Sequence, residues 1–210
     1  MIDLYSWSTP NGRKVSIMLE ETKLDYKLFP INITKDDQFE KNFLEISPNN
    51  KIPAIYDHDN KLSMMESGAI LMYLSEKTGI FKPNNNEDRW KRDEWLMFQM
   101  ASLGPMLGQV HHFVKFNSGK SVYAEERYSK EALRIYGVLN TRLGSSQYVV
   151  GNEYGIADIS IWPWIARFEW QNIDLGKFPN VLRWYKEIAS REAVISGYDI
   201  PSMGAAIPIP

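Results

Sequence analysis

The sequence predicts a small α/β domain followed by an all-helical domain. Strand-like and helix-like patterns alternate over the first 80 residues, whereas only helical patterns occur from about Pro83 onward. The polar run Asn84–Asn86 separates the two regions and is typical of a linker. We therefore expect a first domain over residues 1–80 and a second over residues 87–210.

The first region reads as βαβ, then α, then ββα. The expected strands are 2–5, 28–33, 52–57 and 61–64, and the expected helices are 13–21, 38–46 and 66–78. Pro30 predicts an edge position for the second strand or an irregularity within it, because proline cannot donate a ladder hydrogen bond. The turn at residues 58–60 joins the last two strands as an antiparallel hairpin.

The second region carries long helical segments. They are expected over residues 87–116, 122–143, 156–171 and 181–190. In the third of these, Gly155 stands at the helix start and Asp158 follows three residues later, where its carboxylate can accept N–H bonds of the first turn. We interpret Asp158 as structural.

Composition excludes several classes of protein. The 210 residues are 44% hydrophobic and 24% charged, as in ordinary globular proteins. Lys plus Arg (24) nearly balances Asp plus Glu (26), which argues against nucleic acid as a partner. No apolar run approaches the roughly 18 residues of a membrane span, and the N-terminus lacks signal-peptide features. We expect no membrane insertion and a cytoplasmic location.

The chain contains no cysteine. Structural disulfides, thiolate metal sites and a cysteine nucleophile are therefore excluded. If the protein handles thiol chemistry, a bound small molecule must supply the thiol.

Three features of the first domain suggest such a ligand. Residues 8–12, Ser-Thr-Pro-Asn-Gly, join a strand to a helix whose N-terminus favours a thiolate, and Thr9 and Asn11 can add hydrogen bonds. Ile52-Pro53 opens the third strand and can expose backbone to a peptide-like ligand. Glu66 can bind an ammonium group, and Ser67 can cap the next helix, whose N–H groups bind a carboxylate. Each feature alone is also a common cap or stop signal.

The energetics of such a thiolate site are sufficient without a protein cysteine. A free thiol has a pKa of about 8.5, and lowering it by one or two units needs roughly 1.4–3 kcal/mol. A helix N-terminus supplies about 0.5–2 kcal/mol and a hydroxyl donor about 1.5–3 kcal/mol. Tyr5 lies inside the first strand, where its ring should pack, so it is a poor thiolate donor.

The sequence resembles the glutathione transferases, and within them the bacterial Nu-class group related to the yeast nitrogen-regulator prion protein. The segments that carry the resemblance are STPNGRKVSIMLEE at 8–21, EISPNNKIPAI at 45–55, ESGAILMYL at 66–74, LGPMLGQVHHF at 103–113, EERY at 125–128 and GIADISIWPW at 155–164. The resemblance covers nearly the whole chain. It implies a thioredoxin-like N-terminal domain, a helical C-terminal domain and a homodimer.

The resemblance also implies a glutathione site. Its residues would be Asn11, Gln38, Lys51, Ile52, Glu66 and Ser67, with Arg127 reaching the glycine end of the ligand from the partner subunit. Thr9 and Asn11 would face the sulfur, although Ser8 adds a second hydroxyl beside Thr9. The match further predicts that the Ile52-Pro53 peptide is cis.

The expected function is that of a glutathione-dependent disulfide reductase, in which bound glutathione or its disulfide does the thiol chemistry. Conjugation of glutathione to an electrophile is the alternative within enzymes. A non-enzymatic module that binds glutathione and docks a partner is the alternative outside them. The Asn/Gln-rich extension of the yeast regulator is absent from this sequence, which weakens the regulatory alternative.

The pair His111-His112 invites a metal interpretation that the spacing does not favour. Neighbouring residues of a helix point about 100° apart and cannot chelate one ion from the same face. We expect packing or an interdomain hydrogen bond instead, and no metal cofactor.

Overall fold

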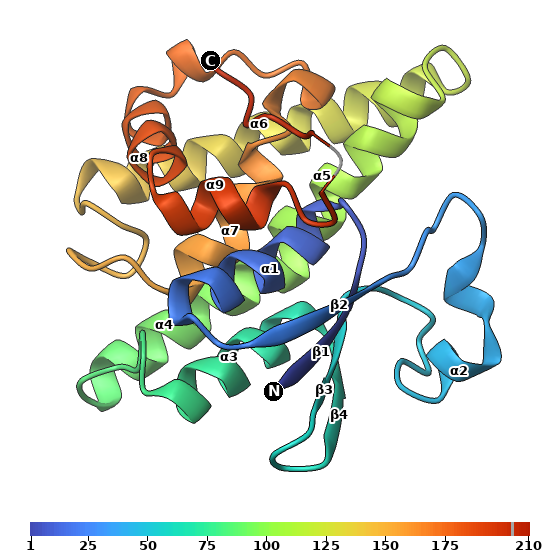
Figure 1. Cartoon of the computed structure of the whole chain (residues 1–210). Helices are drawn as coiled ribbons and strands as arrows, with labels where there is room; N and C mark the ends of the chain where they lie inside the picture. The colour runs from blue at the N-terminus through green and yellow to red at the C-terminus, as the bar shows by residue number, and fades with distance from the viewer. Residues whose placement is uncertain (203) are drawn as a thin grey trace. The chain divides into compact units, whose positions relative to one another are not determined.

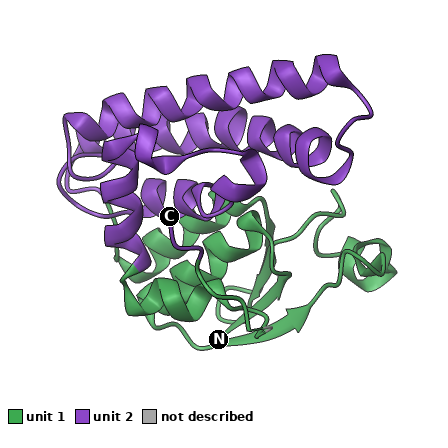
Figure 2. Cartoon of the chain, turned by 90° about the horizontal axis from the view of Figure 1, so that it is seen from above, with its two compact units in different colours: residues 1–82, 190–207 green, residues 83–189, 208–210 purple. Residues whose placement is uncertain are grey.

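The computed structural model describes residues 1–202 and 204–210, and the chain forms two compact units (Figure 2). The first unit comprises residues 1–82 and 190–207, and the second comprises residues 83–189 and 208–210. The chain therefore leaves the first unit after Lys82 and returns to it at Ser190. The predicted combination of an α/β domain and an all-helical domain is confirmed.

The first unit contains a mixed four-stranded sheet within its described residues. Its strands, β1 (Ile2–Ser6), β2 (Tyr26–Pro30), β3 (Ala54–Asp57) and β4 (Leu62–Met65), lie in the order β2-β1-β3-β4. β1 and β2 are parallel, whereas β1 and β3, and β3 and β4, are antiparallel. The edge position that Pro30 predicted for β2 is confirmed. α1 (Pro10–Thr22) and α3 (Ser67–Thr78) lie on one side of the sheet and α2 (Lys41–Leu44) on the other (Figure 1).

Several element boundaries differ from the sequence expectation. β2 ends at Pro30 rather than at residue 33, because Asn32 begins a turn in which its Oδ1 accepts from the Thr34 N–H at 3.0 Å. The helix expected over 38–46 is a 3-10 turn, Asp37–Phe39, followed by the short α2. β3 begins at Ala54 rather than at Ile52.

α1 is buried along most of its length because a helix from the far end of the chain packs against it. This helix, α9 (Glu192–Tyr198), was not predicted from the sequence. A Cβ added to Gly197 would lie 2.6 Å from the Ile17 Cα, so the two helices approach closely only because this position is glycine. Ser16 Oγ donates to the Gly197 carbonyl at 2.6 Å, and Arg191 Nε pairs with Glu21 Oε1 at 2.7 Å.

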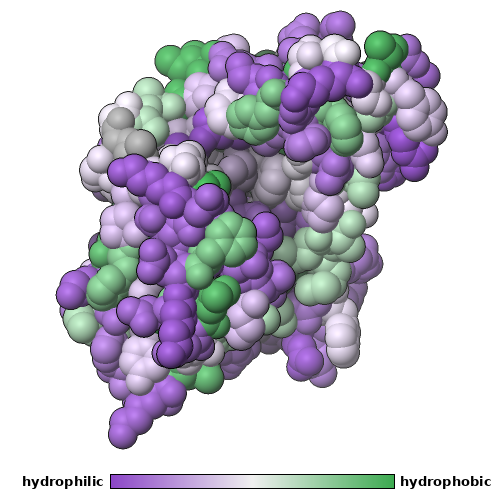
Figure 3. All heavy atoms as spheres, turned by 90° about the vertical axis from the view of Figure 1, so that its right-hand side faces the viewer, coloured by the Kyte–Doolittle hydropathy of each residue, from purple (hydrophilic) through white to green (hydrophobic). Residues whose placement is uncertain are grey.

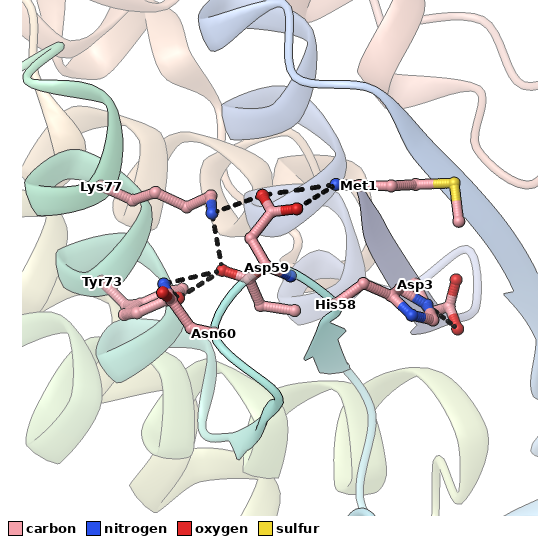
Figure 4. A network of polar contacts seen from close by, with 8 residues as sticks. Met1, Asp3, His58, Asp59, Asn60, Tyr73 and Lys77 are labelled. Carbon is pink, nitrogen blue, oxygen red and sulfur yellow. Dashed lines mark hydrogen bonds and ion pairs between the residues drawn. The ribbon is translucent and has the colours of Figure 1, made fainter.

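A polar network ties the β3–β4 hairpin to α3 (Figure 4). Lys77 of α3 places its Nζ 2.8 Å from Asp57 Oδ2 and 2.9 Å from Asp59 Oδ2. Tyr73 donates a hydrogen bond to the fully buried Asp57 carboxylate, and the Met1 amino group donates to Asp59 at 3.2 Å. Burial alone would raise the pKa of Asp57, but hydrogen bonds from Lys77, Tyr73 and a backbone N–H lower it to about 2.

The described part of the second unit is helical apart from one isolated bridge, Tyr148–Gly151. Its α-helices are α4 (Asn86–Phe98), α5 (Gly104–Val110), α6 (Val122–Gly144), α7 (Ile156–Ile165) and α8 (Pro179–Ala189). The single helix expected over 87–116 is interrupted by π-helical turns at Gln99–Leu103 and His111–Phe116. The helix expected over 156–171 ends at Ile165, and a separate 3-10 turn covers Phe168–Gln171.

Asp158 anchors the start of α7, as predicted. Its Oδ2 accepts from the Gly155 N–H at 3.1 Å, and its Oδ1 accepts from the Val149 N–H at 3.0 Å and from Trp184 Nε1 at 2.8 Å. Burial raises the pKa of Asp158 to about 6, against the opposing effect of these donors. The carboxylate therefore joins three segments of the second unit. None of the described helices combines the length and the apolar character that crossing a bilayer requires.

We predict that Lys77→Met lowers the free energy of unfolding by about 2–3 kcal/mol, because it leaves the Asp57 carboxylate buried without its cation. Urea unfolding at pH 7 measures this. Lys82→Met is the matched control, since Lys82 pairs with Glu76 and both side chains are 54% exposed. It should change stability by less than about 0.5 kcal/mol. Equal effects of the two substitutions would contradict the assigned role of Lys77.

The same network predicts acid sensitivity. The folded-state pKa of Asp57, about 2, lies below the value of about 4 for an unfolded chain. The contribution of Asp57 to stability is therefore complete above about pH 4 and is lost as the pH falls toward 2. The stability difference between the wild type and Asp57→Asn should shrink over this interval in a series of urea unfolding curves. A stability difference between the two proteins that is independent of pH would contradict this role of Asp57.

Candidate functional site

Strand register brings the three motifs singled out in the sequence to one edge of the sheet. Ala54, the first residue of β3, pairs with Tyr5 of β1 on one side and with Met65 of β4 on the other. The turn that follows β1, the Ile52-Pro53 peptide that precedes β3 and the Glu66-Ser67 pair that follows β4 therefore emerge at the same edge. Neighbouring strands lie about 4.8 Å apart, so a small peptide can contact all three.

Thr9 is the N-cap residue of α1. Its backbone is extended (φ −114°, ψ 162°), and its Oγ1 accepts a hydrogen bond from the Gly12 N–H at 3.1 Å. A hydroxyl that accepts in this way can still donate its own hydrogen. Thr9 thus combines a structural role with the capacity to donate to an anion, and half-buried Asn11 lies two residues further along the chain.

The expected packing of Tyr5 is confirmed, since its ring stacks on Phe29 with the centroids 4.9 Å apart. Burial and the nearby Asp3 carboxylate raise its pKa. Both effects disfavour a role for Tyr5 in thiolate chemistry.

Gly12 permits a close approach between α1 and the end of β1. A Cβ at this position would lie 2.2 Å from the Trp7 carbonyl oxygen and 2.5 Å from Ser6 Oγ. Both distances are far inside van der Waals contact. Any larger residue would push the first turn of α1 away from the sheet and displace Thr9 with it.

Ser8 is held by a buried arginine that the sequence analysis did not single out. Arg13 Nη2 donates to Ser8 Oγ at 2.9 Å, and Arg13 Nε donates to the Tyr198 carbonyl at 2.8 Å. The guanidinium also lies 3.5 Å from the centroid of the Tyr198 ring. Ser8 is therefore fixed from the side of α9, whereas Thr9 is fixed by its own helix.

The Ile52-Pro53 peptide is cis, as predicted. Ile52 is half-buried and Pro53 is buried, and β3 begins at the next residue. Ser47 Oγ donates to the Lys51 carbonyl at 2.8 Å, which fixes the backbone before the peptide, and the Lys51 residue is exposed.

Glu66 and Ser67 each lie one position further into the start of α3 than expected. Glu66, not Ser67, occupies the N-cap position of α3, with φ at +70°, and its side chain makes no capping hydrogen bond. Ser67 is the first residue of the helix, and its Oγ accepts from Lys14 Nζ at 3.2 Å. The prediction that Ser67 caps the helix was wrong, because the helix already begins at Ser67 and Glu66 holds the N-cap position.

Gln38 has an unsatisfied acceptor among the described residues. Its Nε2 donates to Asp36 Oδ1 at 3.3 Å, whereas its Oε1 is buried and accepts no hydrogen bond from the described part of the chain. An unpaired buried amide oxygen is costly, so a donor from a ligand would be favourable here.

Arg127 belongs to the second unit and is exposed on α6. It lines a cavity of about 670 Å³ together with Met106, Tyr123, Glu126, Tyr128, Lys130, Glu131 and Arg134. The charge of Arg127 contributes, after the hydrogen bond from Arg134, to the lowered pKa of Glu131.

His111 is a packed core histidine of the second unit. Its ring stacks on Trp164 with the centroids 5.6 Å apart, and its Nε2 lies 3.1 Å from Gln171 Nε2. Burial, together with the charge of Arg167, lowers the pKa of His111 to about 4, so the ring is neutral near pH 7. Its hydrogen bond stays within the unit. Over residues 1–202 and 204–210, no three His, Asp or Glu side chains are grouped as metal ligands.

A thioredoxin-like sheet unit, in a chain that also forms an all-helical unit, defines the glutathione-transferase class of fold. Family models for the glutathione S-transferase N-terminal domain and C-terminal domain match residues 4–84 and 103–192. The chain belongs to the glutathione S-transferase family.

Characterised relatives and solved structures extend the match to nearly the whole chain. The Escherichia coli disulfide-bond oxidoreductase YfcG is 49% identical over 198 residues, which cover 92% of each protein. A glutathione transferase from Burkholderia graminis, solved with two glutathione molecules per subunit, is 41% identical with a TM-score of 0.90, over 97% of this chain and 89% of that one. One from Pseudomonas putida, solved with glutathione disulfide, is 40% identical with a TM-score of 0.90, over 96% and 92%.

We predict that Gly12→Ala destabilises the protein by at least about 2 kcal/mol, because the added methyl group overlaps the Trp7 carbonyl and Ser6. Gly137→Ala is the matched control. Gly137 lies within α6, and an added Cβ there meets no atom within 4 Å. Alanine at that position should stabilise the protein by up to about 1 kcal/mol. Thermal unfolding of the two variants measures both effects, and a Gly12→Ala protein as stable as the wild type would argue against the close approach.

Proposed function

We propose that this protein is a glutathione-dependent thiol–disulfide oxidoreductase of the bacterial Nu class, active as a homodimer in the cytoplasm. The reaction takes place at the sheet edge where the N-termini of α1 and α3 meet the cis-proline strand. The cytoplasmic location fits a reaction that consumes reduced glutathione, since that compartment maintains a reducing glutathione pool.

One observation supports this proposal above the others. The N-terminus of α1, which can stabilise an anion, lies at the same end of the sheet as the start of β3, which can bind a peptide, and the chain contains no cysteine. Thr9 can donate to a thiolate, and the positive end of the α1 dipole lies beside it. The reaction that best fits these features, and that needs no protein thiol, is exchange between glutathione and a disulfide. The oxidoreductase activity named for YfcG supports the same choice.

The reaction is two successive thiol–disulfide exchanges. The thiolate of one bound glutathione attacks a substrate disulfide, forms a mixed disulfide and releases one substrate thiolate, which is then protonated. The thiolate of a second glutathione attacks the glutathione sulfur of the mixed disulfide, which yields glutathione disulfide and releases the second substrate thiol. The site has only to bind glutathione and lower the pKa of its thiol.

The γ-glutamyl and cysteinyl parts of glutathione would each have a complementary group in the first unit. The Ile52 backbone pairs with the cysteinyl peptide, as an added strand would. Glu66 accepts from the ligand ammonium group, and Ser67 with the start of α3 binds the adjacent carboxylate. The Oε1 of Gln38 accepts a ligand N–H, and Lys51 presents an ammonium group near the same edge.

The homodimer proposal rests on Arg127 and on the exposed apolar side chains of the second unit. Trp90 and Met97 are 63% and 51% exposed and lie seven residues apart on one face of α4. Tyr123 and Leu133 of α6 are 76% and 51% exposed. Apolar residues also reach the surface on the face shown in Figure 3, among mostly hydrophilic ones. A partner subunit would cover apolar area and bring its Arg127 to the glycine carboxylate of the ligand.

Two other functions use the same site. Conjugation would direct the thiolate to an electrophilic carbon, and a non-enzymatic module would bind glutathione without turnover. A two-assay comparison separates them: reduction of a hydroxyalkyl disulfide by glutathione, followed through glutathione reductase and NADPH, and conjugation to chlorodinitrobenzene, followed by absorbance. We expect turnover of the disulfide to exceed conjugation by at least about tenfold. Conjugation alone, or binding of glutathione without turnover in either assay, would reject the proposal.

We predict that Thr9→Val raises the pKa of the bound glutathione thiol by roughly one to two units, because a hydroxyl donor to the thiolate is lost. At neutral pH the rate at saturating glutathione should fall about tenfold or more, with little change in affinity. Titration of thiolate absorbance against pH measures the pKa directly.

The matched variants for this test are Thr9→Ser and Ser8→Ala. Thr9→Ser keeps both the hydroxyl and the helix cap, so it should titrate as the wild type does. Ser8→Ala removes the acceptor of Arg13 and should leave the thiol pKa nearly unchanged. If Ser8→Ala raises the pKa and Thr9→Val does not, Ser8 is the thiolate donor.

We predict that Arg127→Ala weakens glutathione binding by roughly one to two decades, because a charged hydrogen bond to a ligand carboxylate contributes about 1.5–3 kcal/mol. Calorimetric titration gives the affinity, and light scattering gives the oligomeric state. Lys130→Ala, which removes a cation from the same cavity, is the control and should bind nearly normally. A monomer that binds glutathione at full strength would refute both the dimer and the role of Arg127.

A further inference from the structure

A lysine ammonium group is buried beneath the carboxylate-binding end of α3. Lys14 lies in the second turn of α1 and is 1% exposed, and its Nζ donates to Ser67 Oγ at 3.2 Å. Lysine is among the residues least often fully buried, because removing an ammonium group from water is costly. Neither the fold comparison nor the proposed chemistry assigns it a role.

The direction of this hydrogen bond orients the Ser67 hydroxyl. An ammonium group can only donate, so Ser67 Oγ is the acceptor and its own hydrogen must point elsewhere. Ser67 is the first residue of α3, where the N–H groups and the helix dipole favour an anion. Lys14 therefore orients the Ser67 hydroxyl at a helix start that favours an anion.

Lys14 and Glu66 carry opposite charges that would complement the two charges of a zwitterionic ligand group. Burial lowers the pKa of Lys14 well below its usual value, while the Glu66 carboxylate opposes this and favours the charged form. The γ-glutamyl end of glutathione carries an ammonium group and a carboxylate on the same carbon. With its ammonium on Glu66 and its carboxylate above Ser67, the negative charge of the ligand faces Lys14 and the positive charge faces Glu66.

We propose that Lys14 is a positioning residue for the α-carboxylate of the ligand: it orients the Ser67 hydroxyl and supplies the counter-charge that selects a zwitterionic γ-glutamyl head. The proposal rests on the proposed binding of glutathione at this sheet edge. It adds that the affinity contributed by the α-carboxylate depends on Lys14, whereas the reaction at the sulfur does not.

A thermodynamic cycle between one side chain and one ligand group tests this. The ligands are glutathione and an analogue in which 4-aminobutyrate replaces the γ-glutamyl residue, so that only the α-carboxylate is missing. The proteins are the wild type, Lys14→Met and Lys14→Gln, with Lys27→Met as the control for loss of one positive charge from the same unit. Isothermal titration calorimetry gives the dissociation constants, and the disulfide assay gives kcat and KM.

In the wild type and Lys27→Met, removal of the ligand carboxylate should weaken binding by about 30-fold or more, as expected for a buried charge pair. In Lys14→Met the same removal should weaken binding only about threefold. The KM for glutathione should rise in that variant with kcat within about twofold of the wild-type value. Lys14→Gln, which keeps a donor to Ser67 without the charge, should fall between them.

Each other outcome has a defined meaning. An equal carboxylate effect in Lys14→Met and in the wild type would overturn the proposal and leave glutathione binding intact. Wild-type protein that does not bind glutathione would overturn the proposed function together with it. Failure of both Lys14 variants to fold, judged by circular dichroism, would assign Lys14 to the fold alone and also overturn the proposal.

Discussion

The pairing of Ala54 between Tyr5 and Met65 is the constraint on which the site depends. A shift of register by one residue in β3 would turn its side chains to the other face and move the cis-proline peptide out of line with the starts of α1 and α3. The hairpin network of Asp57, Lys77 and Asp59 holds this register from the opposite end of β3, because it joins the β3–β4 turn to α3. Residues remote from the proposed ligand site therefore determine whether its candidate binding groups meet.

The proposed site would work through backbone placement and buried charge rather than through a reactive side chain. Thr9 both caps α1 and can donate outward, so the group that would stabilise the thiolate is fixed by the helix whose dipole assists it. Arg13 and Lys14 occupy adjacent positions of the same helix and serve opposite sides, one toward Ser8 and Tyr198 and the other toward Ser67. In the proposed glutathione site, a single helix would thereby link the sulfur end to the γ-glutamyl end.

The parts of this arrangement that depend on local pattern could be predicted from the sequence. Alternation of strand and helix signals predicted the order of the elements, and Pro30 predicted that β2 is an edge strand. Both predictions follow from backbone chemistry within a few residues. The burial of Arg13 could not be predicted, since its partner Tyr198 is 185 residues away. Ser67 was misplaced by one residue, because the helix begins at Ser67 itself, and its contact with Lys14, 53 residues earlier, lies outside any local capping rule. One signal was present in the sequence. The residues that follow Arg13 and Lys14 in α1, Val15–Leu19, form no polar face, which indicates that this part of the helix is buried on several sides.

The return of residues 190–207 to the first unit has a consequence for biosynthesis. On the ribosome, the sheet and α1 emerge first, but the side of α1 that carries Ser16 and contacts Gly197 stays open until α9 has been translated. The nascent N-terminal segment must therefore persist with this helix face uncovered while more than a hundred residues of the second unit are made. The first unit can be completed only after α9 has been translated, so a message truncated before α9 would yield a product whose first-made part is the one left unfinished.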